Sequence, residues 1–329
     1  MTRAGVISGD AGSGERFDVV TFGEALAVFH PQTPGPLTGV RSFDKGVGGA
    51  ELNVAIGLAR LGHRVAWIGR VGADPFGDEI LATLRSEGID VTHAQVDPHA
   101  PTGLYFKELR ALGEARMHYV RDGTAASHTR PEDLHLATLK GARLLHLTGI
   151  TPALSDDCRA ASLAALDEAC ASGVQVSFDA NLRWTLLADR DPKALLAPLL
   201  ERSDLLFLAA DESQVLLGDV RPGELQAILE RLNAREIVVH DHTGAHAITN
   251  YAITRVCARP VTVLDSVGAG DAFVAGYLSG WLREWEPQDR LRLAEFCAAS
   301  VITMPGDFAG APTQADALAA LDGPTIRQR

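Results

Sequence analysis

Short apolar segments alternate with stretches of helical spacing along most of the chain, and this alternation constrains the fold more than any other feature of the sequence. Short apolar runs of this kind indicate strands, which are predicted at Asp18–Phe22, Val65–Gly69, Leu144–Leu147, Val174–Phe178, Leu205–Leu208 and Ile237–Val239. Helices are predicted near 50–61, 76–88, 156–172, 192–201, 212–217 and 223–233. The succession predicts an α/β fold in which helices cover both faces of a doubly wound, mostly parallel sheet.

Residues 98–121 break this alternation. Two short β-like stretches, Thr102–Lys107 and Met117–Arg121, lie on either side of Leu112–Ala115. This arrangement is typical of a hairpin. We expect the hairpin to belong to a lid beside the main sheet.

Charge limits the partners that the chain can have. Its 329 residues carry a formal net charge of −12 without a basic block, which argues against nucleic acid and anionic membranes as partners. No apolar run reaches the ~18 residues that span a bilayer. Residues 1–16 are rich in Gly, Ser and Ala and lack the apolar core of a signal peptide. We therefore expect a cytoplasmic protein with a flexible tail at 1–16.

The segment Asp265–Phe273 reads DSVGAGDAF and is predicted to hold a phosphate group. The apolar run Val261–Leu264 before it predicts a strand, and the residues after it repeat at helical spacing. Gly268, Ala269 and Gly270 are placed to bring backbone N–H groups close to an anion at the start of that helix. Asp271 follows directly, where a carboxylate is placed to accept the proton of a hydroxyl that attacks the phosphate. The alternative is that Asp271 only caps the helix.

A second glycine motif, Gly46–Asn53, reads GVGGAELN and also opens a predicted helix. By itself this motif is better explained by a turn or by close packing than by a binding site. Together, and in this order, the two motifs resemble the ribokinase-like (phosphofructokinase B) family of carbohydrate kinases. The resemblance runs from about residue 17 to about residue 320. One branch, the 2-keto-3-deoxygluconate kinases, is most similar, through Val47–Val54, Thr102–Phe106, Leu145–Leu154, Phe178–Arg183 and Gly306–Pro312.

The resemblance implies a three-layer α/β/α kinase domain over residues 17–323, followed by a short tail at 324–329. It implies that segments near 26–47 and 98–121 form a small β-sheet lid over the sugar. Enzymes of this branch use ATP and Mg²⁺ to phosphorylate the terminal hydroxyl of a sugar acid. In this chain the resemblance implies that Asp271 is the base and that the Gly268–Gly270 amides lie at the γ-phosphate. Family members are often assembled as homo-oligomers.

The resemblance also implies which residues hold the sugar. It places Gly49 and Asn53 against the hydroxyl groups, although Asn53 is also placed for a helix-start hydrogen bond. Arg121 and Arg183 are suited to pair with the carboxylate of an acid substrate, unless they are ordinary solvated surface charges. Three further positions resemble family residues near the substrate, with core packing as the alternative for the tyrosines: Tyr105, Tyr119 and Asp307.

The positions expected to serve the metal and the nucleotide depart from the family pattern. Glu212 stands where relatives carry a glutamate that holds metal-bound water, but the asparagine that usually precedes it is absent; a helix-start carboxylate is the alternative. In the nucleotide loop the chain retains Gly244 and has no lysine. His240 is at best a partly charged substitute for that lysine.

These observations favour an ATP-dependent kinase of 2-keto-3-deoxygluconate. A fructokinase or ribokinase-like enzyme acting on a neutral sugar is the first alternative. A sugar-binding sensor with little turnover is the second, because the nucleotide loop is altered.

Overall fold

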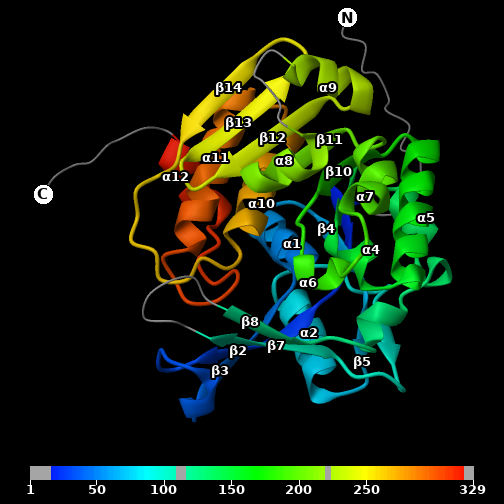
Figure 1. Cartoon of the computed structure of the whole chain (residues 1–329), viewed down its shortest axis with the longest axis vertical. Helices are drawn as coiled ribbons and strands as arrows, with labels where there is room; N and C mark the ends of the chain where they lie inside the picture. Colours follow the sequence, from blue (N-terminus) through cyan, green and yellow to red (C-terminus); the bar gives the residue numbers. More distant parts are fainter. Residues whose placement is uncertain (1–15, 109–115, 219–223, 322–329) are drawn as a thin grey trace, which may run out of the picture.

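The computed structural model describes residues 16–108, 116–218 and 224–321, and the chain forms three layers (Figure 1). The predicted hairpin turn at 112–115 and nearly all of the two predicted tails lie outside these residues. The main sheet has eight strands, which lie in the order β14 (Ile253–Cys257), β13 (Gly244–Thr249), β12 (Glu236–Asp241), β11 (Leu205–Ala209), β10 (Gln175–Asp179), β9 (Leu144–Thr148), β1 (Val19–Phe22) and β4 (Val65–Ile68). The strands from β12 to β4 are parallel, whereas β13 and β14 add an antiparallel edge.

Helices cover both faces of this sheet, as the alternation predicted. One face packs against α1 (Ala50–Arg60), α2 (Pro75–Ser86), α10 (Ala269–Leu282) and α11 (Pro287–Val301), with α12 (Gln314–Leu321) beside α11. The other face packs against α3 (Leu136–Lys140), α4 (Ile150–Leu154), α5 (Asp156–Ser172), α6 (Trp184–Leu187), α7 (Pro192–Leu200), α8 (Ala210–Leu217) and α9 (Leu225–Leu232). Within β1, Val19 joins the first core and Val20 and Phe22 join the second, because successive side chains of a strand point to opposite faces.

A smaller sheet forms the predicted lid. Its strands lie in the order β3 (Phe43–Gly48), β2 (Leu26–Pro31), β7 (Gly103–Glu108) and β8 (Arg116–Val120). A separate pair, β5 (Arg70–Gly72) with β6 (Gln95–Asp97), and short 3₁₀ helices at Leu37–Gly39, Ala125–His128 and Pro131–Asp133 complete the described elements. The chain passes from the end of β1 at Phe22 into β2 at Leu26, so the lid adjoins the carboxyl ends of the parallel strands (Figure 1).

The predicted strand at Val261–Leu264 is wrong, because this segment is an irregular and largely exposed stretch. Val263 is 55% exposed and Leu264 is 63% exposed. The edge of the sheet is occupied by the β13–β14 hairpin, and the amides of Leu264 and Asp265 both donate to the carbonyl oxygen of Ile302 instead of to a strand. Over the described part of the chain, the helices are all too short or too polar to cross a bilayer.

Tyr277 connects helix α10 to the sheet, and this contact predicts a measurable contribution to stability. Its fully buried hydroxyl donates to Glu236 at 2.8 Å, and its ring meets Phe207 edge-on. Tyr277→Phe keeps the ring but leaves a buried carboxylate oxygen without that donor. We expect urea unfolding to show a free energy of unfolding lower by about 1–3 kcal/mol. Tyr251→Phe, at a site 98% exposed, is the matched control; equal effects of the two substitutions would contradict the assignment.

Candidate active site

A cavity of about 630 Å³ lies between the carboxyl ends of the parallel strands and the lid. It brings together nearly all of the residues predicted from the sequence. They come from the lid, from the ends of the central strands and the loops that follow them, from the first turns of α1, α8 and α10, and from the loop between α11 and α12. These are Gly49, Asn53, Tyr105, Tyr119, Arg121, Arg183, Glu212, His240, Gly268, Ala269, Gly270, Asp271 and Asp307. Gly244 is the exception, since it does not line this cavity.

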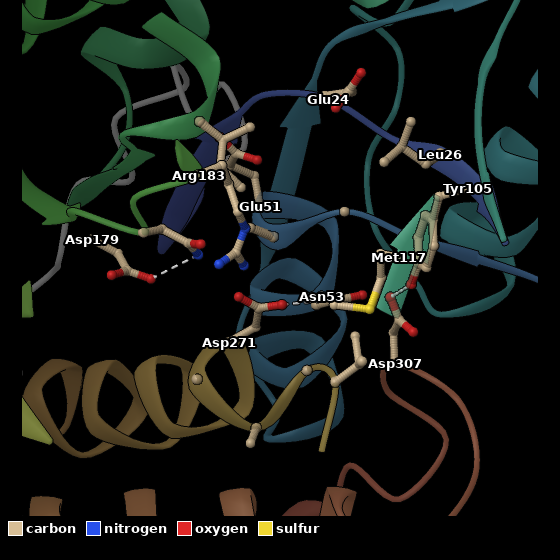
Figure 2. A pocket seen from close by; sticks show the side chains of 18 of the residues that line it. Glu24, Leu26, Glu51, Asn53, Tyr105, Met117, Asp179, Arg183, Asp271 and Asp307 are labelled. Carbon is tan, nitrogen blue, oxygen red and sulfur yellow. Dashed lines mark hydrogen bonds between the residues drawn. The ribbon is translucent and has the colours of Figure 1, made fainter. Parts of the chain in front are cut away.

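Asp271 lies buried in the first turn of α10. The N-cap of this helix is Gly268, so the alternative in which Asp271 is the cap residue is wrong. Its carboxylate accepts a hydrogen bond of 2.7 Å from the side-chain amide of Asn53 on α1 (Figure 2). Burial raises the pKa of Asp271 to about 6, against the opposing effects of the Asn53 hydrogen bond and the charge of Arg183. The carboxylate is therefore mostly ionised at pH 7 but remains more basic than an ordinary aspartate.

Asn53 makes this contact across the cavity with its side chain rather than at its own helix start. The amide nitrogen of the side chain is engaged by Asp271, while its buried oxygen has no partner among the described residues. An unpartnered buried acceptor is unfavourable by itself. It is placed to accept a hydrogen bond from a hydroxyl group of a ligand.

Two glycines allow the backbone to turn at the edges of the cavity. Gly268 has φ +82°, and a Cβ atom there would collide with the backbone of Asp307. Gly49 has φ +136°, and a Cβ atom there would collide with the carbonyl group of Glu24. Close packing thus requires both glycines whether or not a ligand is bound. The first N–H groups of α10 lack partners within the helix, and Gly268, Ala269 and Gly270 line the cavity.

The two predicted arginines share the cavity but have different surroundings. Arg183 is exposed, and Figure 2 shows its guanidinium group pointing toward Asp271. Arg121 is 7% exposed, forms an ion pair with Glu24 and lies 4.6 Å from the centroid of the Tyr119 ring. The surface alternative is therefore wrong for Arg121. Its charge is already partly compensated by Glu24, which the sequence did not single out.

Tyr105 and Asp307 form part of a buried network that also contains a lysine. The Tyr105 hydroxyl donates to Asp307, as Figure 2 shows, and its ring contacts that of Tyr119. Lys107 is fully buried and pairs with Asp307 at 2.9 Å and with Asp265 at 2.6 Å. We did not predict Lys107 from the sequence. The available signal was its spacing, because Lys107 lies two residues after Tyr105 and therefore on the same buried face of β7.

Glu212 and Asp179 place two further carboxyl groups in the cavity wall. Both oxygens of Glu212 accept backbone N–H groups, from Leu182 at 2.6 Å and from Ala209 at 2.9 Å, as the helix-start alternative predicted. Burial, with the charges of Glu212 and Asp271, raises the pKa of Asp179 well above its usual range. Within the described ranges, no group of three or more His, Cys, Asp or Glu residues is arranged to hold a metal. A metal role for Glu212 stays a prediction, limited to contact through water.

Glu51 is another buried carboxyl group that the sequence analysis did not assign. One oxygen accepts hydrogen bonds from the hydroxyls of Thr148 and Thr151, both at 2.7 Å, and the other has no partner among the described residues. Burial raises the pKa of Glu51 to about 7. The cavity wall thus combines several acidic groups with few cations.

The structure describes both residues expected in the nucleotide loop, and their role in nucleotide binding stays a prediction. Burial lowers the pKa of His240 to about 4, so the ring, which stacks on Phe273, is neutral at physiological pH and does not replace a lysine charge. Gly244 begins β13 with φ +145°, and a Cβ atom there would collide with the carbonyl group of Val256 on β14. Strand packing therefore explains this glycine without a nucleotide.

Comparison with known proteins gives consistent matches over most of the chain. The family model described as pfkB family carbohydrate kinase matches residues 16–314. The 2-dehydro-3-deoxygluconokinase of Thermoproteus tenax is 37% identical over 91% of this chain and 92% of its own length. The enzyme of the same name from Bacillus subtilis is 33% identical over 91% and 94%. A fructokinase of Klebsiella pneumoniae is 34% identical over 82% and 90%.

Solved structures show the same similarity in three dimensions. A PfkB protein from a Polaromonas species has a TM-score of 0.83 at 35% identity and covers 92% of this chain and 99% of its own. The 2-dehydro-3-deoxygluconokinase of Thermotoga maritima has a TM-score of 0.85 at 26% identity, with coverage of 94% and 99%. A fructokinase of Xylella fastidiosa with bound ATP has a TM-score of 0.81 at 28% identity, with coverage of 93% and 98%.

The contact between Asn53 and Asp271 predicts the direction of a pKa change. The donated hydrogen bond favours the ionised carboxylate, so Asn53→Ala should raise the pKa of Asp271 above its value of about 6. Titration of the side-chain carboxyl ¹³C signals by NMR measures this shift, and Asp271→Asn identifies the signal by its loss. An unchanged or lower pKa in Asn53→Ala would show that the hydrogen bond does not stabilise the carboxylate.

Proposed function

Since the chain belongs to the pfkB family of carbohydrate kinases, we propose that it transfers the γ-phosphoryl group of ATP to the terminal 6-hydroxyl of 2-keto-3-deoxygluconate, also named 2-dehydro-3-deoxygluconate. The observation that carries the choice of substrate is the presence of Arg121 and Arg183 in the same cavity as Asp271. A guanidinium group pairs with a carboxylate in a planar, bidentate geometry, which a neutral sugar does not offer. The names of the relatives from Thermoproteus tenax and Bacillus subtilis support the same substrate.

In this proposal Asp271 is the general base. The oxygen of the acceptor hydroxyl forms a bond to the γ-phosphorus, the bond from that phosphorus to the ADP oxygen breaks, and the hydroxyl proton passes to the Asp271 carboxylate. A base with a pKa of about 6 is mostly ionised at neutral pH and is still basic enough to accept this proton. Asn53 fixes the orientation of the carboxylate through its hydrogen bond.

The start of α10 supplies the stabilisation of the phosphoryl group. The backbone N–H groups of Gly268, Ala269 and Gly270 and the positive end of the helix dipole attract negative charge. This contribution is important here because His240 is neutral and therefore adds no net charge. The relative from Xylella fastidiosa with bound ATP supports ATP as the donor.

The acidic groups near the strand ends fit magnesium only as an ion held through water. Both oxygens of Glu212 are engaged by backbone N–H groups, and one oxygen of Asp179 accepts from Asn181 at 3.2 Å. Mg²⁺ usually keeps several of its waters and uses few protein ligands, so Asp179 and Glu212 would hold these waters. When bound, the ion neutralises charge on the nucleotide phosphates.

A neutral hexose is the second candidate acceptor, and one contact favours it. Arg121 is already paired with Glu24, so of the two predicted arginines Arg183 alone has no ion pair among the described residues. The fructokinase of Klebsiella pneumoniae, which is 34% identical, supports this alternative.

A sensor without turnover is disfavoured, because a sensor has no use for a buried base beside a phosphate-binding helix. We also propose that the enzyme works in the cytoplasm as a homo-oligomer.

Asp271→Asn tests the general base. The amide keeps the shape of the side chain but accepts no proton at neutral pH, so kcat should fall by about 10²- to 10⁴-fold. The KM for the acceptor should change far less. Asp78→Asn, an exposed carboxylate in the first turn of α2, is the matched control and should keep its activity. A coupled assay of ADP release measures all three proteins, and a kcat within a factor of about two of wild type in Asp271→Asn would refute the role.

Arg183→Ala tests the class of acceptor. The same assay first compares wild-type turnover of 2-keto-3-deoxygluconate, gluconate, fructose and ribose with magnesium and ATP. Loss of an ionic hydrogen-bonded contact should raise the KM for the acid by about 10- to 100-fold and leave that for a neutral sugar nearly unchanged. Arg85→Ala, at an exposed position of α2, is the control. Equal effects on acid and neutral acceptors, or wild-type turnover of fructose or ribose alone, would overturn the sugar-acid assignment.

A further inference from the structure

Lys107 is a fully buried cation that joins three segments far apart in the sequence. It lies on lid strand β7, and its ammonium group contacts Asp265 at 2.6 Å and Asp307 at 2.9 Å. Asp265 begins the segment that leads into α10, and Asp307 lies in the loop before α12. The proposed roles of Asp271 as general base and of the two arginines in binding the carboxylate give Lys107 no function.

Asp265 determines the shape of the segment that holds the phosphate. One of its oxygens accepts the backbone N–H of Val267 at 3.1 Å, and the other accepts the backbone N–H of Gly306 at 3.2 Å as well as the Lys107 ammonium. Val267 directly precedes Gly268, whose N–H group and those that follow line the cavity. A displacement of Asp265 would therefore move the N–H groups that face the phosphate.

Asp307 extends the same connection to the lid. Its backbone packs so closely on Gly268 that a Cβ atom at residue 268 would collide with it, and its carboxylate packs equally closely on Gly48 at the end of β3. The same carboxylate accepts a hydrogen bond from Tyr105. Lid strands β3 and β7 thus contact the phosphate-holding segment through Asp307 and Lys107.

Stability alone is a weak explanation for this cluster. Moving an ammonium and two carboxylates out of water is unfavourable, and a buried ion pair often stabilises a fold no more than apolar side chains of similar volume. The neighbouring inward position of β7 is occupied by a tyrosine that is also bound to Asp307. A charged group here is more useful for holding two carboxylates in a defined geometry.

We propose that Lys107 is a positioning residue for phosphoryl transfer, which ties the phosphate-holding segment 265–271 to lid strand β7. The inference rests on the kinase activity described above and adds a residue to it. With the lid strand in place, Lys107 holds Asp265, and Asp265 holds the N–H groups at the start of α10 in line with the acceptor. Transfer to the acceptor is then favoured over transfer to water, because the geometry for transfer forms only beneath the lid.

Lys107→Met tests this role, with Lys45→Met as the matched control. Methionine has similar length and no charge, and Lys45 is an exposed lid lysine on β3 that pairs with Glu79. A misplaced phosphate-holding segment should lower kcat by about 10²-fold and change the acceptor KM far less. ADP release per acceptor phosphorylated should rise above one. Lys45→Met should match wild type in each quantity.

Hydrogen–deuterium exchange supplies a second measurement that needs no acceptor. In Lys107→Met the amides of Val267 and Gly306 should exchange about tenfold faster, while the strands of the main sheet exchange as in wild type. A simple loss of stability would instead accelerate exchange throughout the core. Unchanged exchange at these two amides, or equal changes in kcat and KM, would overturn the proposal.

Asp265→Asn changes the other partner of the contact between Lys107 and Asp265. This variant tests the positioning role if Lys107→Met does not fold. It keeps an oxygen for Val267 and weakens the pairing with Lys107, so it should lower kcat and accelerate exchange at Val267 and Gly306. Wild-type kcat and exchange in Asp265→Asn would overturn the proposal. Where both variants fold, the double variant should be no worse than the poorer single one, because the two residues act through one contact.

The tests of Lys107→Met remain informative if the proposed acceptor is wrong. The kinetic tests use whichever sugar the wild-type enzyme phosphorylates, and the exchange test uses none. Turnover of fructose in place of the sugar acid would end the sugar-acid assignment and leave the Lys107 test intact. Normal turnover of the sugar acid by Lys107→Met would end the positioning role and leave the sugar-acid assignment intact.

Discussion

The parallel direction of the central strands is the constraint on which the rest of the structure depends. Strands β1, β9, β10, β11 and β12 point the same way, so the segments that follow them meet at one edge of the sheet. Helices packed on both faces fix the strands and thereby the ends from which the polar groups project. The lid begins at the same edge because β2 continues directly from β1. The main sheet and the lid sheet therefore face each other across the cavity.

The same geometry gathers acidic groups away from water, which is unfavourable for the fold. Burial raises the pKa of Asp271 from 3.8 to about 6. When the pKa of a carboxyl group is higher in the folded state, the folded protein becomes less stable as pH rises from the pKa of the unfolded state to that of the folded state. For Asp271 this range runs from about 4 to about 6. At neutral pH the full penalty is present, on the order of 3 kcal/mol for a shift of this size. A site built for stability would omit these groups, and for Asp271 the proposed role as a general base near neutral pH explains why it is retained.

The sequence predicted those features that depend on local pattern. Strands such as β1 and β9, and the strands of the lid hairpin, follow from short apolar runs, and the glycine motifs follow from backbone constraints at Gly49 and Gly268. The exposed segment Val261–Leu264 was misjudged because an apolar β-branched run does not reveal whether a neighbouring strand is available. The buried ion pairs were missed for a different reason. Lys107 and Asp265 are 158 residues apart, and Arg121 and Glu24 are 97 apart, so only the fold brings them together.

The pairing of Arg121 with Glu24 makes the proposed binding of an acid compatible with a cavity that holds no bare buried cation when the acid is absent. An unpaired guanidinium at a site 7% exposed would be strongly unfavourable, and Glu24 offsets part of that penalty in the free enzyme. The pair leaves donors unused, since the Nε–H of Arg121 has no partner among the described residues. Arg121 therefore has a hydrogen-bond donor left for an incoming carboxylate without breaking the contact with Glu24. A neutral sugar would offer the Nε–H of Arg121 a weaker acceptor than a carboxylate does. The cavity would then disfavour the neutral sugar because this buried donor is poorly satisfied, and not because of a steric clash.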